Sequence, residues 1–370
     1  MSNFFGDVGL NRVSFLREDT EFIKLAFTSS EAKFIVFVNG EAFYDISSDG
    51  KPQLHIETST SLKGIITTLS PLLETKDLRV DVSGVSITFL GLDDRIDGFS
   101  YKGKYKGAPY FGLEFKVDYK TLLTPKDIEF TTSLQRMDRE SLFMIDNHSA
   151  TLYSHAKMYL DWLNKYKFCP GCGSVIYPVH GGTKLQCSSA PEVNCNVRNA
   201  RVNNVCFPRS DPVIIIAMAN EDYSKICLAR SFRKHGNFVM YSTIAGFMEP
   251  GESIENACAR EIWEETGVHC DVDNVKIISS QPWPYPANLM IGCLGIVKFN
   301  NKDEIIDLGN DPELMDAQWF DTNEVRAAMD SYKTGWLVPF KDEINFPGET
   351  AIAHHLIRHV CKQHQRLQKL

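Results

Sequence analysis

The chain has 370 residues, of which 43% are hydrophobic and 23% are charged. This is the usual balance of globular domains, and the length suits two or three of them. The longest apolar runs are far shorter than the ~20 residues that cross a bilayer, so a membrane-spanning protein is excluded. The formal net charge of −8 argues against broad electrostatic binding to nucleic acid, although a local basic patch stays open.

The N-terminal region predicts a mostly β domain over residues 1–135. It contains no cysteine, and turn residues separate short runs typical of strands at 32–38, 78–90 and 111–117. The polar, glycine-rich stretch 93–106 predicts a loop. Residues 136–166 carry apolar side chains with a rough period of 3.6 and predict a helical connector.

The C-terminal region, residues 210–370, changes to strands interleaved with helices. An apolar run at 213–218 predicts a buried strand, and helices are predicted at 253–266 and 351–367. This alternation indicates an α/β fold class.

Between these regions, residues 167–209 hold five of the ten cysteines. Cys169 and Cys172 form a CxxC pair on a glycine-containing turn, and Cys187 and Cys195 follow. Four thiolates suit a tetrahedral, structural Zn²⁺ site. Cys206 is the alternative fourth ligand to Cys195. A CxxC redox pair or free buried cysteines are the other interpretations.

The residues at the two ends of the chain bear on where in the cell the protein is expected. Residues 1–19 lack the apolar segment of a secretory signal and are not rich in arginine, so neither type of leader is expected. A cytoplasmic protein is therefore expected. The final Gln368, Lys369 and Leu370 resemble the peroxisomal Ser-Lys-Leu signal weakly, because glutamine stands in place of serine.

The strongest signal is a helix that carries Glu261, Glu264 and Glu265 at positions i, i+3 and i+4. This spacing puts the three carboxylates on one helix face, where like charges repel. Oxygen ligands at this density suit Mg²⁺ or Mn²⁺, whereas a solvated acidic face is the alternative. Glu252 and Arg260 are expected to form an ion pair that holds the preceding loop to the helix.

The ends and the packing face of this helix are also predictable. Ser253 is the expected N-cap and Gly267 the expected C-terminal stop. Two apolar pairs at i, i+4 are expected to pack on the sheet: Cys258 with Ile262, and Ala259 with Trp263.

A proline-rich segment follows the helix shortly afterwards. Its prolines alternate with glutamine, tryptophan and tyrosine, which predicts a stiff extended loop whose rings can stack on a nucleobase or a pyridine ring. The alternative is a turn with the rings in the core. The residues concerned are Gln281, Pro282, Trp283, Pro284, Tyr285, Pro286, Ala287 and Asn288.

Both segments resemble a known family. The helix and its leading loop fill every fixed position of the Nudix box, GX5EX7REUXEEXGU, with Gly246, Glu252, Arg260, Glu261, Ile262, Glu264, Glu265, Gly267 and Val268. The proline-rich segment resembles the SQPWPFPxS motif of the NADH pyrophosphatase subfamily of Nudix hydrolases. It departs from the motif at Tyr285, which keeps an aromatic ring, and at Asn288, which keeps a polar group.

The resemblance covers nearly the whole chain and implies its architecture. It implies an N-terminal Nudix-like β-rich domain, a zinc ribbon of the eukaryotic type, and a C-terminal Nudix α/β/α sandwich. By the same resemblance, Glu261 and Glu265 are expected as metal ligands, Glu264 as a ligand or base, and Glu313 as a further ligand. A homodimer is also implied.

Substrate contacts are implied by the same resemblance. Phe207 occupies a place usually held by a tyrosine, and Ala245, Gly246 and Phe247 match a substrate-lining turn. Ala353 matches a backbone contact at the start of the last helix. The segment from Gln281 to Asn288 completes the expected substrate-binding set.

These features together predict an enzyme that hydrolyses the pyrophosphate of NADH, NAD⁺ and related dinucleotides to AMP and NMNH or NMN. The alternative is removal of NAD caps from RNA 5′ ends by the same chemistry, for which Arg230, Arg233, Lys234 and His235 are a candidate basic cluster or an ordinary solvated turn. A non-catalytic nucleotide sensor is a different class of protein, and the intact box argues against it.

Overall fold

The computed structural model describes residues 3–7, 9–73, 84–116, 134–200, 202–203, 205–232, 238–310, 313–333, 335–341 and 343–369. Some predicted features lie outside these ranges. They are parts of two predicted strands, the basic residues Arg233, Lys234 and His235, and the final Leu370. None of the described helices is long and apolar enough to cross a membrane.

Contacts divide the chain into two compact units. One comprises residues 210–283 and 288–370 together with residues 1–4. The other comprises residues 5–209 and includes residues 284–287. The finer division into four segments stays a prediction.

The C-terminal unit is built on a six-stranded sheet in which β16, β17, β12, β13 and β18 follow one another. Its centre is the parallel pair of β12 and β17, whereas the other pairings are antiparallel. The strands are β12 (Asp211–Asn220), β13 (Lys225–Ser231), β15 (Ile244–Phe247), β16 (Val275–Trp283), β17 (Asn288–Val297) and β18 (Leu314–Asp321).

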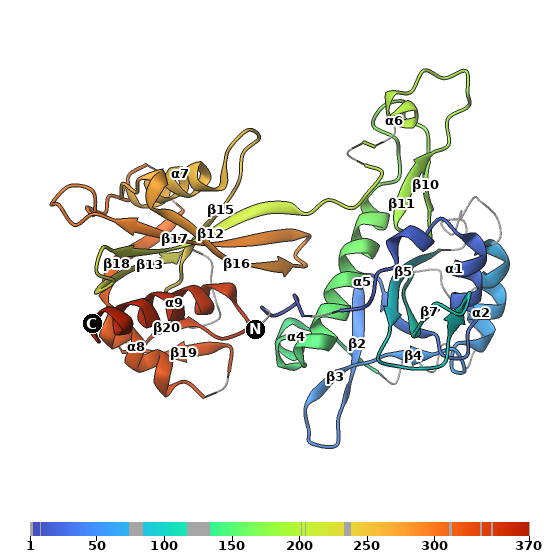
Figure 1. Ribbon diagram of the computed structural model, residues 1–370, viewed down its shortest axis with the longest axis horizontal. Coiled ribbons are helices and arrows are strands. Elements are labelled where there is room, and N and C mark those ends of the chain that lie inside the picture. Colours follow the sequence, from blue (N-terminus) through green and yellow to red (C-terminus); the bar gives the residue numbers. More distant parts are fainter. Residues whose placement is uncertain are drawn as a thin grey trace. The chain divides into compact units, whose positions relative to one another are not determined.

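Helices cover both faces of this sheet (Figure 1). Ile214 and Ile216 of β12 belong to the core beneath α7 (Ile254–Thr266). Their neighbours Ile215 and Ala217 belong to the core beneath α9 (Ile352–Leu367), because successive side chains of a strand point to opposite faces. The predicted α/β/α sandwich is confirmed. The remaining elements are η5 (Val272–Asn274), α8 (Thr322–Ser331) and a small sheet of β14 (Val239–Met240), β19 (Leu337–Pro339) and β20 (Ile344–Pro347).

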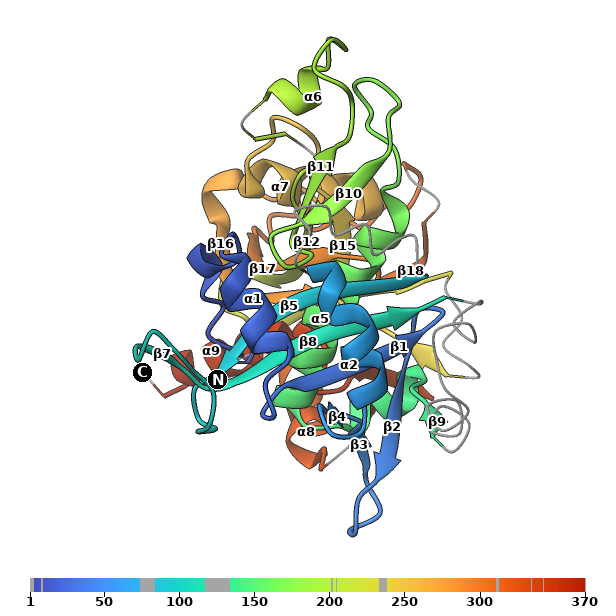
Figure 2. The same cartoon turned by 90° about the vertical axis from the view of Figure 1, so that its right-hand side faces the viewer.

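The N-terminal unit contains a seven-stranded sheet that is also centred on a parallel pair, β1 and β8. Helices α1 and α2 lie on one face and α5 on the other (Figure 2). The strands of the sheet are β1 (Lys33–Val38), β2 (Glu41–Ile46), β3 (Pro52–Leu54), β4 (Glu57–Thr58), β5 (Val85–Asp93), β8 (Ala108–Phe115) and β9 (Gln135–Arg136). The helices are η1 (Ser14–Leu16), α1 (Thr20–Phe27), α2 (Lys63–Leu69), η2 (Ser70–Leu73), α4 (Arg139–Met144) and α5 (Asn147–Lys165).

The two sheets share one topology. The order β2, β1, β8, β5 in the N-terminal unit matches β13, β12, β17, β16 in the C-terminal unit, with the same parallel central pair. The short strand β4 pairs with β1 and leads into α2, as β15 pairs with β12 and leads into α7. The N-terminal unit therefore repeats the fold of the C-terminal unit, as predicted, but α2 carries no carboxylate.

Two local predictions need correction. The stretch 93–106, predicted as a loop, contains the small hairpin of β6 (Ser100–Tyr101) and β7 (Tyr105–Lys106). The helical stretch 136–166 is divided into α4 and α5, because Asp146 caps the start of α5 by accepting a hydrogen bond from the Ser149 amide. Helix α5 packs on β5 and β8 and so forms a layer of the N-terminal unit.

Burial of His354 predicts a pH-dependent stability of the C-terminal unit. Its ring is buried, Nδ1 donates to the Pro347 carbonyl oxygen at 2.9 Å, and burial lowers its pKa to about 4. Since the unfolded pKa is near 6.5, the unfolded state binds more protons between these values, and stability falls as pH drops from 6.5 towards 4. In His354→Asn, we expect the loss between pH 7 and pH 4.5 to shrink by about 2 kcal/mol in denaturant titrations followed by tryptophan fluorescence. Parallel pH curves for the two proteins would contradict this role.

Candidate active site and cysteine metal centre

The loop after β15 and the first turn of α7 form as the local sequence predicts. The Ser253 hydroxyl accepts a hydrogen bond from the Asn256 amide at 3.2 Å, which confirms the N-cap. Gly267 ends the helix with φ of 71°, a conformation that favours glycine.

Arg260 is the centre of the site. Its Nε and Nη2 donate to the two oxygens of Glu252 at 2.6 and 3.0 Å, which confirms the expected ion pair. Its Nη1 donates to Glu261 and to Glu264, both at 2.8 Å. The remaining Nη2 hydrogen goes to the Phe247 carbonyl oxygen at 2.9 Å. All five N–H groups of the guanidinium are therefore used.

Gly246 is required by the position of Glu261. A β-carbon at residue 246 would lie 2.0 Å from the Glu261 carboxyl carbon, far inside van der Waals contact. The glycine therefore lets a sheet strand approach the carboxylate of the helix. Ala245 and Phe247 flank it as exposed residues.

The carboxylates carry more negative charge than the single arginine balances. Arg260 lowers the pKa of Glu252 through its hydrogen bonds. Burial raises the pKa of Glu261, Arg260 opposes the rise, and the charges of Glu264 and Glu313 add to it. Glu313, which directly precedes β18, thus lies within electrostatic reach of Glu261 although it is distant in sequence.

The rest of α7 divides into a buried and an exposed side. Ala257, Cys258 and Ile262 pack in the core, and Glu265 is buried on the same helix. The expected packing of Trp263 on the sheet is wrong, since 44% of this residue is exposed. The sheet reaches only the side of α7 centred on Ile262, which lies about 100° around the helix from Trp263.

The proline-rich segment is not the extended loop that was expected. Gln281, Pro282 and Trp283 are the last residues of β16, and Asn288 begins β17. Pro284, Tyr285, Pro286 and Ala287 form the turn of this hairpin. The segment is held in place because the pairing of β16 with β17 extends as far as Trp283 and Asn288.

The Gln281 side chain is buried and fully engaged. Its amide nitrogen donates to the carbonyl oxygens of Phe4 and Thr350, at 3.0 and 2.8 Å. Its oxygen accepts from the Ile352 amide at 2.9 Å and so caps α9, which has no side-chain cap from its own Ala351. Gln281 thereby fixes the first turn of α9, where Ala353 lies. Sequence reasoning missed this role because the partners are far away in the chain.

Two aromatic residues of the predicted substrate set, Tyr285 and Phe207, lie beside cationic side chains. The Arg139 guanidinium lies 4.6 Å from the centre of the Tyr285 ring, and the Lys184 ammonium lies 5.7 Å from that of the Phe207 ring. Both distances fit cation–π contacts. Sequence reasoning missed Arg139 and Lys184, and no motif marks either of them.

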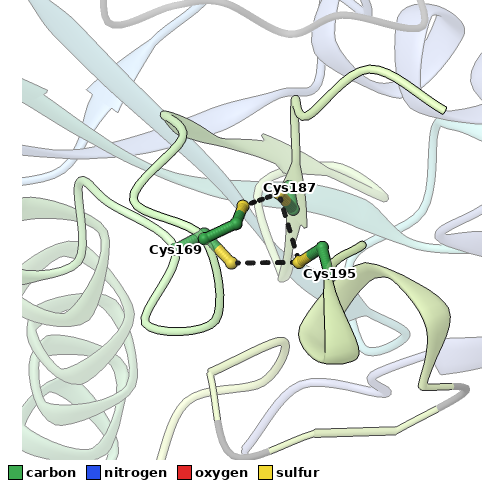
Figure 3. A group of neighbouring side chains, drawn as sticks. Cys169, Cys187 and Cys195 are labelled. Atoms are coloured by element: carbon green, nitrogen blue, oxygen red, sulfur yellow. Dashed lines mark hydrogen bonds between the residues drawn. The ribbon is translucent and has the colours of Figure 1, made fainter. Parts of the chain in front are cut away.

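The cysteine cluster forms between β10 (Ile176–Val179), β11 (Lys184–Cys187) and α6 (Asn196–Asn199). The sulfur atoms of Cys169, Cys172, Cys187 and Cys195 all lie within 4.8 Å of one another. Figure 3 shows Cys169, Cys187 and Cys195 with their sulfur atoms directed toward one another. The Cys169–Cys195 and Cys172–Cys187 sulfur distances are 3.6 and 3.5 Å. Tetrahedral bonds of ~2.3 Å separate sulfur ligands by ~3.8 Å, so the group fits a four-thiolate metal site.

Arg198 explains how the long gap between Cys187 and Cys195 is compatible with this site. Its guanidinium donates to the carbonyl oxygens of Ser189, Ala190, Pro191 and Val193, all in that gap. The Arg198 amide also donates to the Cys195 sulfur at 3.2 Å. One arginine therefore folds the loop so that Cys195 reaches the cluster.

Cys206, the alternative ligand, lies elsewhere. Its sulfur donates to the Asn203 carbonyl oxygen and accepts from the Asn203 amide, at 3.1 and 3.3 Å. The structure therefore selects Cys195 as the fourth member of the cluster.

Comparison with known proteins agrees with the fold of the C-terminal unit. Residues 208–337 match the NUDIX domain family. The chain is 54% identical to the NAD-capped RNA hydrolase NPY1 of Saccharomyces cerevisiae, over 99% of this chain and 97% of the relative. It is 32% identical to the NAD-capped RNA hydrolase of Schizosaccharomyces pombe, over 96% of this chain and 92% of the relative.

A mouse relative carries a different name. The chain is 32% identical to the mitochondrial NAD(P)H pyrophosphatase NUDT13 of Mus musculus, over 60% of this chain and 57% of the relative. The chain belongs to the Nudix hydrolases, in the subfamily of the NADH pyrophosphatases.

Two matched substitutions test the metal centre. Cys195→Ser removes one thiolate of the cluster, so we expect the purified protein to lose most of its bound metal by plasma emission spectrometry. Cys206→Ser should retain the metal at the wild-type ratio, because its sulfur is outside the cluster. Equal metal content in both variants would contradict the assignment.

A single methyl group tests the carboxylate site. In Gly246→Ala, the added carbon displaces Glu261, so we expect binding of the paramagnetic probe Mn²⁺ to weaken roughly tenfold or more in electron paramagnetic resonance titrations. Ala245→Ser, at the exposed neighbouring position, is the control and should bind Mn²⁺ normally. Unchanged binding by Gly246→Ala would show that Glu261 is not a ligand.

Proposed function

We propose that this protein hydrolyses the pyrophosphate of NADH, NAD⁺ and related dinucleotides to AMP and NMNH or NMN. The observation that carries the proposal is the cluster of Glu252, Glu261 and Glu264 around Arg260, with Glu313 nearby. The Nudix family membership and the name of the mouse relative support the same reaction.

The carboxylate set fits a divalent cation. Glu261, Glu264, Glu265 and Glu313 would hold Mg²⁺ or Mn²⁺, since these ions prefer carboxylate oxygens and the cluster has an excess of negative charge. When bound, such ions neutralise diphosphate charge and lower the pKa of water. The raised pKa of Glu261 is consistent with this use, because a cation nearby would favour its ionised form.

The surrounding residues of the chain would bind and orient the substrate. Glu264 is the more exposed carboxylate, with 38% of its side chain accessible compared with 13% for Glu261, so it suits the role of base or outer ligand. The exposed Phe247 ring and the half-buried Trp283 ring would hold a base or a ribose. Gln281 would act through the position of Ala353, since its own polar atoms are engaged.

Removal of NAD caps from RNA is the second candidate, and the names of the Saccharomyces and Schizosaccharomyces relatives favour it. The bond and the carboxylates are the same in both reactions. Of the four residues in the candidate basic cluster, only Arg230 lies in the described part of the chain.

Three further assignments belong to this proposal. Zn²⁺ would occupy the Cys169, Cys172, Cys187 and Cys195 cluster as a structural ion, because it prefers tetrahedral thiolate sites. The protein would act as a homodimer. Its expected location is cytoplasmic, with the C-terminal tripeptide as a weak signal for peroxisomes.

A pair of isosteric substitutions on α7 tests the catalytic set. Glu265→Gln removes a ligand charge from the box, so we expect kcat for NADH with Mg²⁺ to fall by at least about a hundredfold while the circular dichroism spectrum stays unchanged. Glu255→Gln, in the first turn of the same helix, should leave kcat within about twofold. Wild-type activity in Glu265→Gln would overturn the assignment of this residue.

The substrate is tested by competition. NADH, NAD⁺, ADP-ribose and NAD-capped RNA are supplied in equal amounts with Mg²⁺ or Mn²⁺, and products are separated by chromatography. Fastest release of AMP and NMNH supports the dinucleotide reaction, whereas faster turnover of capped RNA supports the second candidate. No cleavage of any substrate would favour a nucleotide sensor.

A further inference from the structure

Two arginines of the N-terminal unit converge on one face of helix α5. Arg12 Nη1 contacts His155 Nε2, and Arg17 Nη1 donates to the Tyr159 hydroxyl at 3.3 Å. The Arg17 guanidinium also lies 5.9 Å from the centre of the Tyr159 ring. His155 and Tyr159 are four residues apart on the helix and are neighbours on its surface. The two guanidinium groups therefore meet at one place.

Neither guanidinium has a carboxylate partner in the described part of the chain. No ion pair within 4.0 Å involves Arg12 or Arg17 among the described residues. The adjacent Glu18 is exposed and lies 3.6 Å from His180 Nδ1 instead. Burying the donors of a charged group without a partner is strongly destabilising, so the buried part of Arg17 requires an explanation.

Two donors of Arg17 lack a hydrogen-bond acceptor in the described part of the chain. Its Nε and Nη2 atoms are buried and have no hydrogen-bond partner among the described residues. Guanidinium donors at such positions are normally paired. Arg12 is exposed as a residue, so a ligand can approach the pair from solvent.

The neighbouring groups do not reduce the positive charge. Burial, together with the charges of Arg12 and Arg17, holds the pKa of His155 well below its usual value, so its imidazole is neutral. Desolvation of the guanidinium and the charge of Arg17 lower the pKa of Arg12. Arginine nevertheless stays protonated at neutral pH, so the site carries two positive charges.

We propose that Arg12 and Arg17 form a binding site for a phosphate group. Two planar forks suit a tetrahedral oxyanion, because arginine binds phosphate oxygens bidentately. A phosphate group carries between one and two negative charges at neutral pH and balances both arginines, whereas a carboxylate balances only one. The Tyr159 hydroxyl is a further donor in reach. The site goes beyond the proposed hydrolysis, because it uses none of the carboxylates of α7.

The test is calorimetric titration of the full chain with inorganic phosphate, at constant ionic strength and without added Mg²⁺ or Mn²⁺. The missing divalent cation separates this site from the carboxylate cluster. We expect saturable binding that is at least about tenfold weaker in Arg12→Gln/Arg17→Gln, because each lost charge-assisted hydrogen bond weakens binding by roughly that factor. Lys63→Gln/Lys165→Gln removes the same charge from exposed positions of the same unit and should bind phosphate normally.

A second variant and two further ligands sharpen the result. Arg12→Lys/Arg17→Lys keeps the charge and loses the forks, so it should bind with intermediate affinity and guards against misfolding of the glutamine variant. AMP and a 5′-phosphorylated RNA hexamer identify the source of the group. Equal affinity for all three ligands supports a site for phosphate alone, whereas tighter RNA binding supports recognition of an RNA 5′ end.

Two outcomes would overturn the proposal. One is the absence of saturable phosphate binding to the wild-type chain, and the other is equal affinity in the wild-type and glutamine variants. If the wild-type chain binds no phosphate and its self-association weakens in the glutamine variant, the arginines pair with carboxylates of a second copy instead. Hydrolysis of NADH is measured separately and does not bear on either outcome.

Discussion

The active site depends on the hydrogen bonds of one guanidinium. Glutamates at i, i+3 and i+4 on α7 repel one another, and a further glutamate approaches them from the preceding loop. Arg260 resolves part of this repulsion by directing four of its N–H groups at three different carboxylates, one of which it holds bidentately. Because one positive charge does not balance several negative ones, the cluster keeps an affinity for cations.

The hydrophobic core fixes the positions of these carboxylates. In the sheet, Gly246 of β15 lies opposite Ile214 of β12, whose side chain packs in the same core as Ile262 of α7. The strand and the helix are thus held at a fixed separation, and the missing side chain of Gly246 leaves room for the Glu261 carboxylate. The close packing of protein interiors makes this separation resistant to change.

The repeated fold shows that the scaffold does not require the chemistry. The N-terminal unit has the same strand order and the same strand-to-helix connection, but the sequence of α2 is Lys-Gly-Ile-Ile-Thr-Thr-Leu. Its stability comes from a core rich in aromatic rings, in which Phe27, Phe34 and Phe111 contact one another. A fold of this type hosts a site only where the side chains supply one.

Short-range chemistry was enough to predict the caps of α7, the Glu252–Arg260 pair and the α/β fold class, whereas the α/β/α sandwich was implied by the family resemblance. Each of these depends on residues that are close in the chain, or on a periodic pattern that a helix or strand repeats. The choice of Cys195, the engagement of Gln281 and the exposure of Trp263 were decided only by the tertiary structure. Arg198 folds the long loop before Cys195, and Phe4, Thr350 and Ile352 reach Gln281 from distant positions. Such contacts arise when separate elements pack together, so no local spacing in the chain encodes them.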